Sequence, residues 1–184
     1  MSKIIIGLAG EMACGKGTVA KHLVEKHNAS SYRFSTMLRD VVDRLYIEQT
    51  RENVSKMSTV LRQNFGEDLF AKVMANDVTK DKNEVIVIDG IRRMADIAYL
   101  KEIPEFKLIY MEADVKKCYE RIIQRGENTD DKNKTFEEFL AEHKLETETQ
   151  IKDLKEYASE VIDNNENYDH LYEQIDKIVG ECKD

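Results

Sequence analysis

The sequence predicts an α/β fold in which a five-stranded parallel sheet carries helices on both faces, giving three layers. Apolar, β-branched runs lie within 4–9, 84–89 and 107–111, and such runs are typical of strands buried on both faces of a parallel sheet. Segments with apolar residues at helical spacing separate these runs, and a glycine-rich loop joins the first run to a helix. A fold of this kind binds ligands at the carboxyl ends of its strands.

Two weaker strands, at 31–34 and 160–163, complete the predicted sheet. The glycine-rich loop leads into a helix over about 18–26, and the long segment at about 36–80 predicts two or three further helices. A helical segment broken near Pro104 precedes the strand at 107–111. The remaining expected elements are a helix at 115–125, a polar stretch at 126–134, a long acidic helical region at 136–157 and a closing helix at 168–179.

The composition favours an ordinary globular protein. The chain has 184 residues, 41% hydrophobic and 35% charged, with a formal net charge of −8. These values lie far from those of disordered, collagen-like and membrane-spanning chains, and the negative charge argues against a nucleic-acid partner, since phosphate backbones are held by clustered Lys and Arg. Three widely spaced cysteines without a C-x-x-C pair indicate neither a disulfide framework nor a zinc site. We therefore expect a cytoplasmic protein that does not associate with membranes.

The segment between the first strand and the first helix matches the phosphate-loop (P-loop) pattern G-x-x-x-x-G-K. It comprises Gly10, Glu11, Met12, Ala13, Cys14, Gly15, Lys16, Gly17 and Thr18. In such a loop, glycines let backbone N–H groups point at phosphate oxygens, the helix N-terminus adds partial positive charge, and the lysine reaches the β- and γ-phosphates. The sequence therefore predicts that these residues bind ATP and that Lys16 is catalytic.

Lys16 is followed by Gly17, where the usual P-loop has the Ser or Thr that binds magnesium, and Thr18 comes one place later. This G-K-G-T ending resembles that of adenylate kinase and its nucleoside monophosphate kinase relatives, in which the metal is held largely through water. Met12 and Ala13 stand where adenylate kinases usually have Pro and Gly. The resemblance implies ATP and Mg²⁺ as cofactors, with Thr18 on the metal side.

The strand at 84–89 ends in Asp89, and an apolar strand that ends in an acid is the pattern of a Walker B segment. We expect Asp89 to act in catalysis by ordering the hydrated magnesium ion. Its oxygens would bind the metal through water, as those of Thr18 would.

Two segments resemble the acceptor-binding parts of adenylate kinases. Residues 35–39 are similar to the segment that opens the acceptor-binding helices, which implies that Arg39 holds the acceptor phosphate. The pattern D-G-x-x-R, ending at Arg93, resembles the acceptor-side loop, and D-G-x-R, ending at Arg92, resembles an archaeal family of adenylate-kinase-related P-loop proteins. Both arginines are candidate substrate ligands, although one of them could instead cap the following helix or pair with Asp96.

Arg121 and Arg125 are spaced i, i+4 before the polar stretch, so both project from one helix face. This arrangement resembles the lid of nucleoside monophosphate kinases, and it implies that the two arginines neutralise the transferring phosphoryl group. Asp130 and Asp131 are present as in small-lid relatives, but no arginine follows Arg125 in the chain. Lysine is not an equivalent fork-shaped donor.

The C-terminal segment 161–165 is similar to the last strand and turn of dephospho-CoA kinases, near which the adenine base packs. This implies that Asn164 or Asn165 contacts the base, while a turn favoured by Asn is the plainer interpretation.

Two further features receive no catalytic role. The helix N-terminus and Lys16 are expected to lower the pKa of Cys14, making it sensitive to oxidation or alkylation, but no His accompanies it as a base. The acidic run at 137–148 is interpreted as a solvated helix face, with Lys144 and Lys152 in helical register.

Together these patterns predict one P-loop kinase domain over 1–184. Its core would comprise 1–35, 81–125 and 136–184, with an acceptor-binding insert at 36–80 and a short lid at 126–135. The expected reaction moves the γ-phosphate of ATP to a nucleoside or deoxynucleoside monophosphate. A dephospho-CoA kinase, favoured by the Asn-Asn turn, and an NTP-hydrolysing regulatory switch, suggested by the missing lid arginines, remain open.

Overall fold

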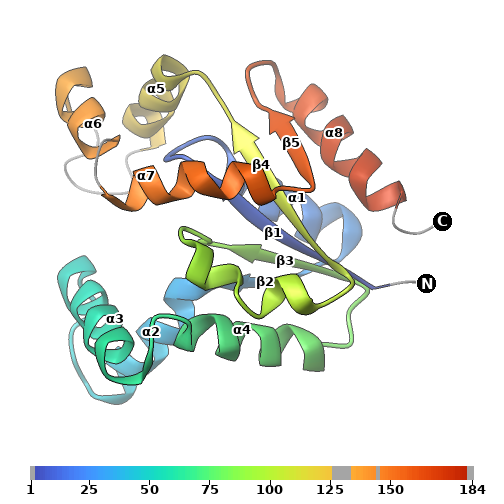
Figure 1. Ribbon diagram of the computed structural model, residues 1–184. Helices are drawn as coiled ribbons and strands as arrows, with labels where there is room; N and C mark the ends of the chain where they lie inside the picture. Colours follow the sequence, from blue (N-terminus) through green and yellow to red (C-terminus); the bar gives the residue numbers. More distant parts are fainter. Residues whose placement is uncertain (1–2, 126–133, 144–145, 182–184) are drawn as a thin grey trace.

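The computed structural model describes residues 3–125, 134–143 and 146–181, which fold around one parallel sheet (Figure 1). Its strands are β1 (Ile4–Gly10), β2 (Ser30–Arg33), β3 (Val85–Asp89), β4 (Phe106–Glu112) and β5 (Glu160–Asp163), in the spatial order β2-β3-β1-β4-β5. All four pairings are parallel. The predicted five-stranded parallel α/β fold is confirmed.

Strand β1 lies between β3 and β4. The pairing brings the ends of these strands, which carry the candidate site, to one edge of the sheet. β1 pairs with β3 on one side, Ile6 opposite Val87, and with β4 on the other. Because all strands run in the same direction, Gly10 and Asp89, the last residues of β1 and β3, lie at the same carboxyl edge.

One face of the sheet is covered by α1 (Lys16–His27), α5 (Val115–Arg125), α6 (Phe136–His143) and α8 (Tyr168–Glu181). Ile4, Ile6 and Leu8 of β1 point into this apolar cluster. Alternate side chains of a strand point to opposite faces, which is why every second residue of the first apolar run belongs here.

The other face is covered by α2 (Phe34–Arg44), α3 (Arg51–Phe65), α4 (Leu69–Lys80) and α7 (Glu146–Asp153), with three short 3-10 helices, η1 (Met94–Ile97), η2 (Leu100–Glu102) and η4 (Leu154–Tyr157). Ile5 and Ala9 of β1 contribute to this second cluster. The two clusters and the sheet between them are the three predicted layers.

Most expected helices are present, with two differences. The acidic region at 136–157 is not one helix, because Phe139 of α6 packs on the first face whereas Ile151 of α7 and Leu154 of η4 pack on the second. The segment between β3 and β4 forms the 3-10 helices η1 and η2. Helices α2, α3 and α4 occupy the predicted insert, and residues 126–133 of the predicted lid lie outside the described residues.

A polar cluster joins α1 to α8. The Asp176 carboxylate lies 2.9 Å from His22 Nε2, 2.6 Å from His27 Nε2 and 2.8 Å from Lys26 Nζ. The His22 ring also stacks on Tyr172, with ring centroids 4.0 Å apart. These contacts hold α1, the helix that follows the P-loop, against α8.

None of the helices in the described ranges combines the length and the apolar character needed to cross a membrane.

Candidate active site

The P-loop links β1 to α1 at the carboxyl edge of the sheet. Gly10 and Gly15 have φ angles of 139° and 109°, in the region that favours glycine. A Cβ on Gly10 would lie 2.4 Å from the carbonyl oxygen of Met111, and one on Gly15 would lie 2.2 Å from the side-chain nitrogen of Asn164. Both glycines are therefore required by conformation and by space, and the loop is held against β4 and the turn after β5.

Lys16 begins α1, and its ammonium group turns back along the loop. Nζ donates to the carbonyl oxygens of Gly10 at 2.6 Å and of Glu11 at 2.7 Å. Between Glu11 and Lys16, Ala13 has φ 57°, a left-handed conformation that is uncommon outside glycine. A curled backbone, a helix N-terminus capped by a glycine and a lysine ammonium fit a phosphate group, because each presents positive charge or N–H donors.

Cys14 is buried within the loop, and its chemistry differs from the expectation. Burial raises the pKa of the Cys14 thiol, and this outweighs the opposing effect of Lys16, whose Nζ lies 3.6 Å from the sulfur. The expected lowering of its pKa is wrong, because the P-loop encloses the side chain in the apolar cluster beneath it. Reactivity through a thiolate is therefore disfavoured.

Asn164 braces the P-loop from the turn after β5. Its buried side-chain nitrogen donates to the carbonyl oxygen of Cys14 at 2.8 Å, and its backbone N–H donates to Glu112 at 2.8 Å. This amide thus has a structural partner within the predicted ATP site. Asn165 instead accepts a hydrogen bond from the backbone N–H of Asp114.

Arg121 projects from α5 toward the same turn. Its Nη2 donates to the carbonyl oxygen of Asn164 at 2.9 Å, whereas its buried Nη1 has no hydrogen-bond partner among the described residues. Arg121 is therefore connected to the P-loop through Asn164, which bonds to both Arg121 and Cys14. Arg125 ends α5, but its side chain lies outside the described part of the chain.

Asp89 ends β3, and its carboxylate pairs with Arg33, an arginine that no sequence motif indicates. Arg33, the last residue of β2, donates from Nε at 3.0 Å and from Nη2 at 2.8 Å to the same carboxylate oxygen, Oδ2. The parallel register places Arg33 directly beside Asp89. The sequence around Arg33 gives no sign that it pairs with Asp89, because Asp89 lies on a different strand, β3.

A cavity of about 450 Å³ lies beside the Arg33–Asp89 pair. Gly17 and Thr36 also line it, and a Cβ on Gly17 would meet nothing within 4 Å. Thr18, in the first turn of α1, is half-buried. The absence of a Ser or Thr side chain at position 17 therefore leaves open space in the cavity that Asp89 also lines.

The three arginines predicted to bind the acceptor have different surroundings. Arg39 is exposed on α2, with its Nη1 3.5 Å from Gln49 Oε1. The backbone N–H groups of Arg92 and Arg93 both donate to Asp96 Oδ2, at 3.0 and 3.1 Å, so Asp96 shapes the loop that carries them. Of the three, Arg93 lines a cavity.

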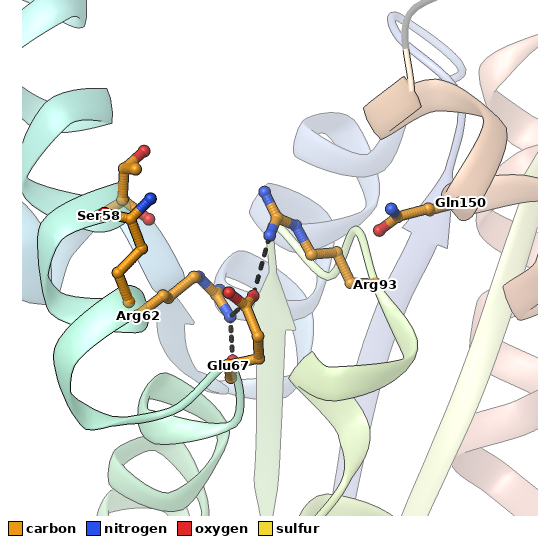
Figure 2. Close-up of a pocket in the computed structure, with 7 residues that line it drawn as sticks. Ser58, Arg62, Glu67, Arg93 and Gln150 are labelled. Atoms are coloured by element: carbon orange, nitrogen blue, oxygen red, sulfur yellow. Dashed lines mark hydrogen bonds and ion pairs between the residues drawn. The ribbon is translucent and has the colours of Figure 1, made fainter.

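Figure 2 shows this second cavity, about 250 Å³ in volume, between α3, the loop after β3 and α7. Arg93 Nη1 lies 3.3 Å from Glu67 Oε2, and Arg62 reaches the same carboxylate at 3.9 Å. The full lining consists of Ser58, Thr59, Arg62, Gln63, Glu67, Arg93 and Gln150. It is a polar site with two guanidinium groups.

Arg62 is the least expected member of the cavity. It is buried, its Nη2 pairs with Asp96 Oδ1 at 2.8 Å, and its guanidinium carbon lies 4.9 Å from the centre of the Phe70 ring. Its Nε is buried without a hydrogen-bond partner in the described ranges. The sequence offered no signal for it, because an arginine on an amphipathic helix is most often exposed.

Sequence comparison identifies the family. The family described as AAA domain matches residues 9–140, which begin just before the P-loop and extend beyond α5 into α6. The chain belongs to this AAA-domain family. The AAA-domain match covers the P-loop, Asp89 and every arginine discussed above, and the kinase-like P-loop fold implies that the chain binds a nucleotide such as ATP.

Curated relatives of this AAA-domain chain include UPF0200 proteins of archaea. One from Methanoregula boonei is 30% identical over 127 residues, which cover 68% of this chain and 69% of the relative. Another, from Methanocaldococcus jannaschii, is 25% identical over 97% of this chain and 90% of its own length. The predicted resemblance to an archaeal P-loop family is confirmed.

Solved structures support the fold of the AAA-domain chain. A shikimate kinase from Bacteroides thetaiotaomicron has a TM-score of 0.63 at 14% identity, covering 96% of this chain and 98% of the kinase. A shikimate kinase from Acinetobacter baumannii in complex with shikimate has a TM-score of 0.55 at 18% identity, covering 97% and 94%. At such identities these likenesses show a common kinase-like fold.

Proposed function

We propose that the protein is an ATP-dependent phosphotransferase whose acceptor is a small anionic molecule, with nucleoside and deoxynucleoside monophosphates as the first class to test. The observation that carries this proposal is the cavity that Arg62 and Arg93 line, close to the strand ends that bear the P-loop and Asp89. Paired guanidinium groups favour phosphate and carboxylate ligands. A protein that only hydrolyses a nucleotide has no need of a second anion site.

The P-loop would hold the donor nucleotide in this proposal. The backbone of Gly10 to Gly15 would curl around the phosphates, and Lys16 Nζ, which now donates to the Gly10 and Glu11 carbonyls, would turn to the β- and γ-phosphates. Thr18 and Asp89 are the residues that would hold hydrated magnesium, which neutralises phosphate charge when it is bound. Asn164 would act by keeping the loop in shape.

Arg33 has a defined part in this proposal. It neutralises the Asp89 carboxylate in the described structure, and both side chains border the cavity beside Gly17. A cation that shares Asp89 with Arg33 would weaken their ion pair. The Arg33 side chain is 59% exposed, so its guanidinium group could turn to an anionic ligand without disturbing the core.

The acceptor cavity would bind by charge and hydrogen bonding. The Glu67 side chain is 61% exposed and pairs with Arg93 at 3.3 Å, so an acceptor phosphate or carboxylate could displace it from Arg93 at low cost. Arg62 would meanwhile keep its buried partner Asp96. The hydroxyl and amide groups of Ser58, Gln63 and Gln150 could orient polar parts of the acceptor. Arg39 would join this site only if α2 moved, since its side chain now faces Gln49.

The dephospho-CoA alternative receives no support from the described turn. It was suggested by the Asn-Asn turn, but Asn164 braces Cys14 and Asn165 holds Asp114. A regulatory switch remains the alternative of another class. It would be favoured by turnover that no acceptor stimulates.

Release of ADP from ATP and Mg²⁺ tests the proposal across ribo- and deoxynucleoside monophosphates, dephospho-CoA and shikimate. One acceptor should stimulate ADP release strongly, and Lys16→Ala should abolish the stimulation. Slow turnover that is indifferent to every acceptor would contradict phosphotransfer and leave the switch.

Arg93→Met provides the second part of this experiment. Because a charged hydrogen bond to the acceptor is lost, KM for the acceptor should rise about 10- to 100-fold while the KM for ATP stays within about twofold. Arg44→Met, which removes an exposed arginine at the end of α2, is the matched control. Equal kinetics for both variants would exclude the Arg93 cavity as the acceptor site.

A further inference from the structure

Glu11 places a negative charge inside the P-loop, where polyphosphate is expected to bind. Its carboxylate lies 3.1 Å from Lys152 Nζ through Oε1 and 3.7 Å from His143 Nε2 through Oε2. Its main-chain carbonyl oxygen accepts the hydrogen bond from Lys16 Nζ at 2.7 Å. The catalytic lysine of the loop and a lysine from α7 therefore meet at the same residue.

The packing of helix α7 fixes the backbone of Lys152 relative to the P-loop. Ile151 is buried in the second apolar cluster, and α7 packs against β1, the strand that leads into the P-loop. The preceding residue, Gln150, lines the cavity of Arg62 and Arg93. Consecutive residues of one helix thus contact the acceptor cavity, the core and the P-loop.

The Lys152 side chain is free to change partner, whereas its neighbour His143 is not. The Lys152 side chain is 60% exposed, so its ammonium group can move without unpacking the helix. His143 is buried beside Phe139, and its Nε2 has no hydrogen-bond partner within the part of the chain that the structure describes. The imidazole therefore confines the Glu11 carboxylate while Lys152 neutralises it.

The charge of Lys152 would reduce the repulsion between Glu11 and a bound polyphosphate. A carboxylate in the P-loop repels a polyphosphate unless a cation lies between them, and the chain contains no arginine after Arg125. An ammonium group has three donors, so it can serve a carboxylate and a phosphate oxygen at the same time.

We propose that Lys152 is a ligand of the terminal phosphates of the bound nucleotide and that the Glu11 carboxylate, beside His143, holds its ammonium group until the nucleotide binds. The inference rests on nucleotide binding within the proposed function and is independent of the acceptor. It gives Lys152 a chemical role, whereas the acidic run at 137–148, with Lys144 and Lys152 in helical register, predicts only a solvated helix face.

Equilibrium binding of ATP with Mg²⁺ by calorimetry tests this role without relying on turnover. Lys152→Met should raise the Kd for ATP about tenfold, the loss expected for one charged contact, and Lys152→Arg should restore it to within about threefold. Lys155→Met is the control, because Lys155 lies one turn further on and pairs with Glu112 at 2.6 Å, outside the P-loop. This control should leave the Kd within about twofold of the wild-type value.

Glu11→Gln separates a ligand role from a structural one. If Lys152 binds phosphate, removing the competing carboxylate should lower the Kd for ATP about threefold or more, opposite in sign to Lys152→Met. Equal weakening by both variants would mean that the pair is structural and would overturn the inference, as would a Lys152→Met that binds like the Lys155→Met control. A wild-type protein that binds ATP but transfers phosphate to no acceptor contradicts only the proposed function. One that binds no ATP overturns both.

Discussion

At the scale of single residues, the shape of the P-loop depends on how much space surrounds each of its glycines. Gly15 has φ 109° and faces the Asn164 side chain, whereas Gly17, two residues on, faces open space. Two glycines in one motif thus serve different purposes. The first is required by packing and conformation, and the second is a place where the common magnesium-binding side chain is absent.

Gly15→Ala should lower the free energy of unfolding by about 2 kcal/mol or more, because its Cβ would strain the backbone and displace Asn164. Gly17→Ala should stay within about 1 kcal/mol of the wild type, since alanine suits a helical position. Urea unfolding followed by circular dichroism measures both. Similar losses for the two variants would show that the contact with Asn164 is unimportant.

The two described cysteines should be inert in the folded protein. Burial raises the pKa of Cys14 despite Lys16, and burial raises the pKa of Cys118 to about 12. Because the thiolate is the reactive form, iodoacetamide at pH 8 should modify neither thiol in the native state and both in urea. Peptide mass spectrometry reads the result. Native labelling of Cys14 at the rate seen in urea would contradict the burial argument.

At the scale of elements, the contact between α1 and α8 connects the P-loop helix to the C-terminal region. The Asp176 carboxylate on α8 pairs with His22, Lys26 and His27 of α1. Desolvation raises the pKa of Asp176, but the hydrogen bonds from Lys26, His27 and His22 outweigh this effect and leave its pKa well below the usual value of 3.8. The carboxylate is therefore more stable in the folded protein than in the unfolded chain.

This difference in pKa predicts a pH-dependent stability. A carboxyl group with a lowered pKa in the folded state stabilises the protein above pH 3.8, and the contribution is lost as the pH falls below that value. Asp176→Asn should therefore cost about 1 to 2 kcal/mol at pH 7 and progressively less from pH 4 to pH 2.

Urea unfolding of the wild type and of Asp176→Asn at a series of pH values measures this difference. Asp169→Asn is the control, since Asp169 lies in the exposed first turn of the same helix. A loss for Asp176→Asn that stayed constant down to pH 2 would show that the charge of Asp176 is not the cause.

At the scale of the whole molecule, nucleotide binding should stabilise the fold. The P-loop contacts β4, the turn after β5 and α7, so a ligand that favours its described shape favours the packing of all three. ATP with Mg²⁺ at about 100 times its Kd should add about 2.7 kcal/mol and raise the Tm by about 5 to 10 °C.

Lys16→Met should abolish most of this shift, because the lysine of a P-loop is expected to bind the β- and γ-phosphates. Lys177→Met, on α8 and paired with Glu181, should retain it. Thermal unfolding with and without ATP gives both values. An unchanged shift in Lys16→Met would contradict nucleotide binding at the P-loop.

The fold and the P-loop were predictable because their signals are local. Buried parallel strands are continuous apolar runs, and glycines at fixed spacing between a strand and a helix indicate a phosphate loop wherever they occur. The five strands and the helices α1, α5 and α8 therefore follow from the sequence. The division of 136–157 did not, because only packing on both faces of the sheet breaks that helical pattern.

The sequence by itself determined the fold class, the P-loop and the strand-end Asp89, whereas the tertiary structure decided which charged residues meet. Arg33 and Asp89 are 56 residues apart in the chain, Arg62 and Asp96 are 34 apart, and Lys152 reaches Glu11 from α7. An isolated charged residue has the same sequence signature on a solvated surface as in a site. Its partner depends on how distant segments pack, and burial gives that pairing its energetic weight.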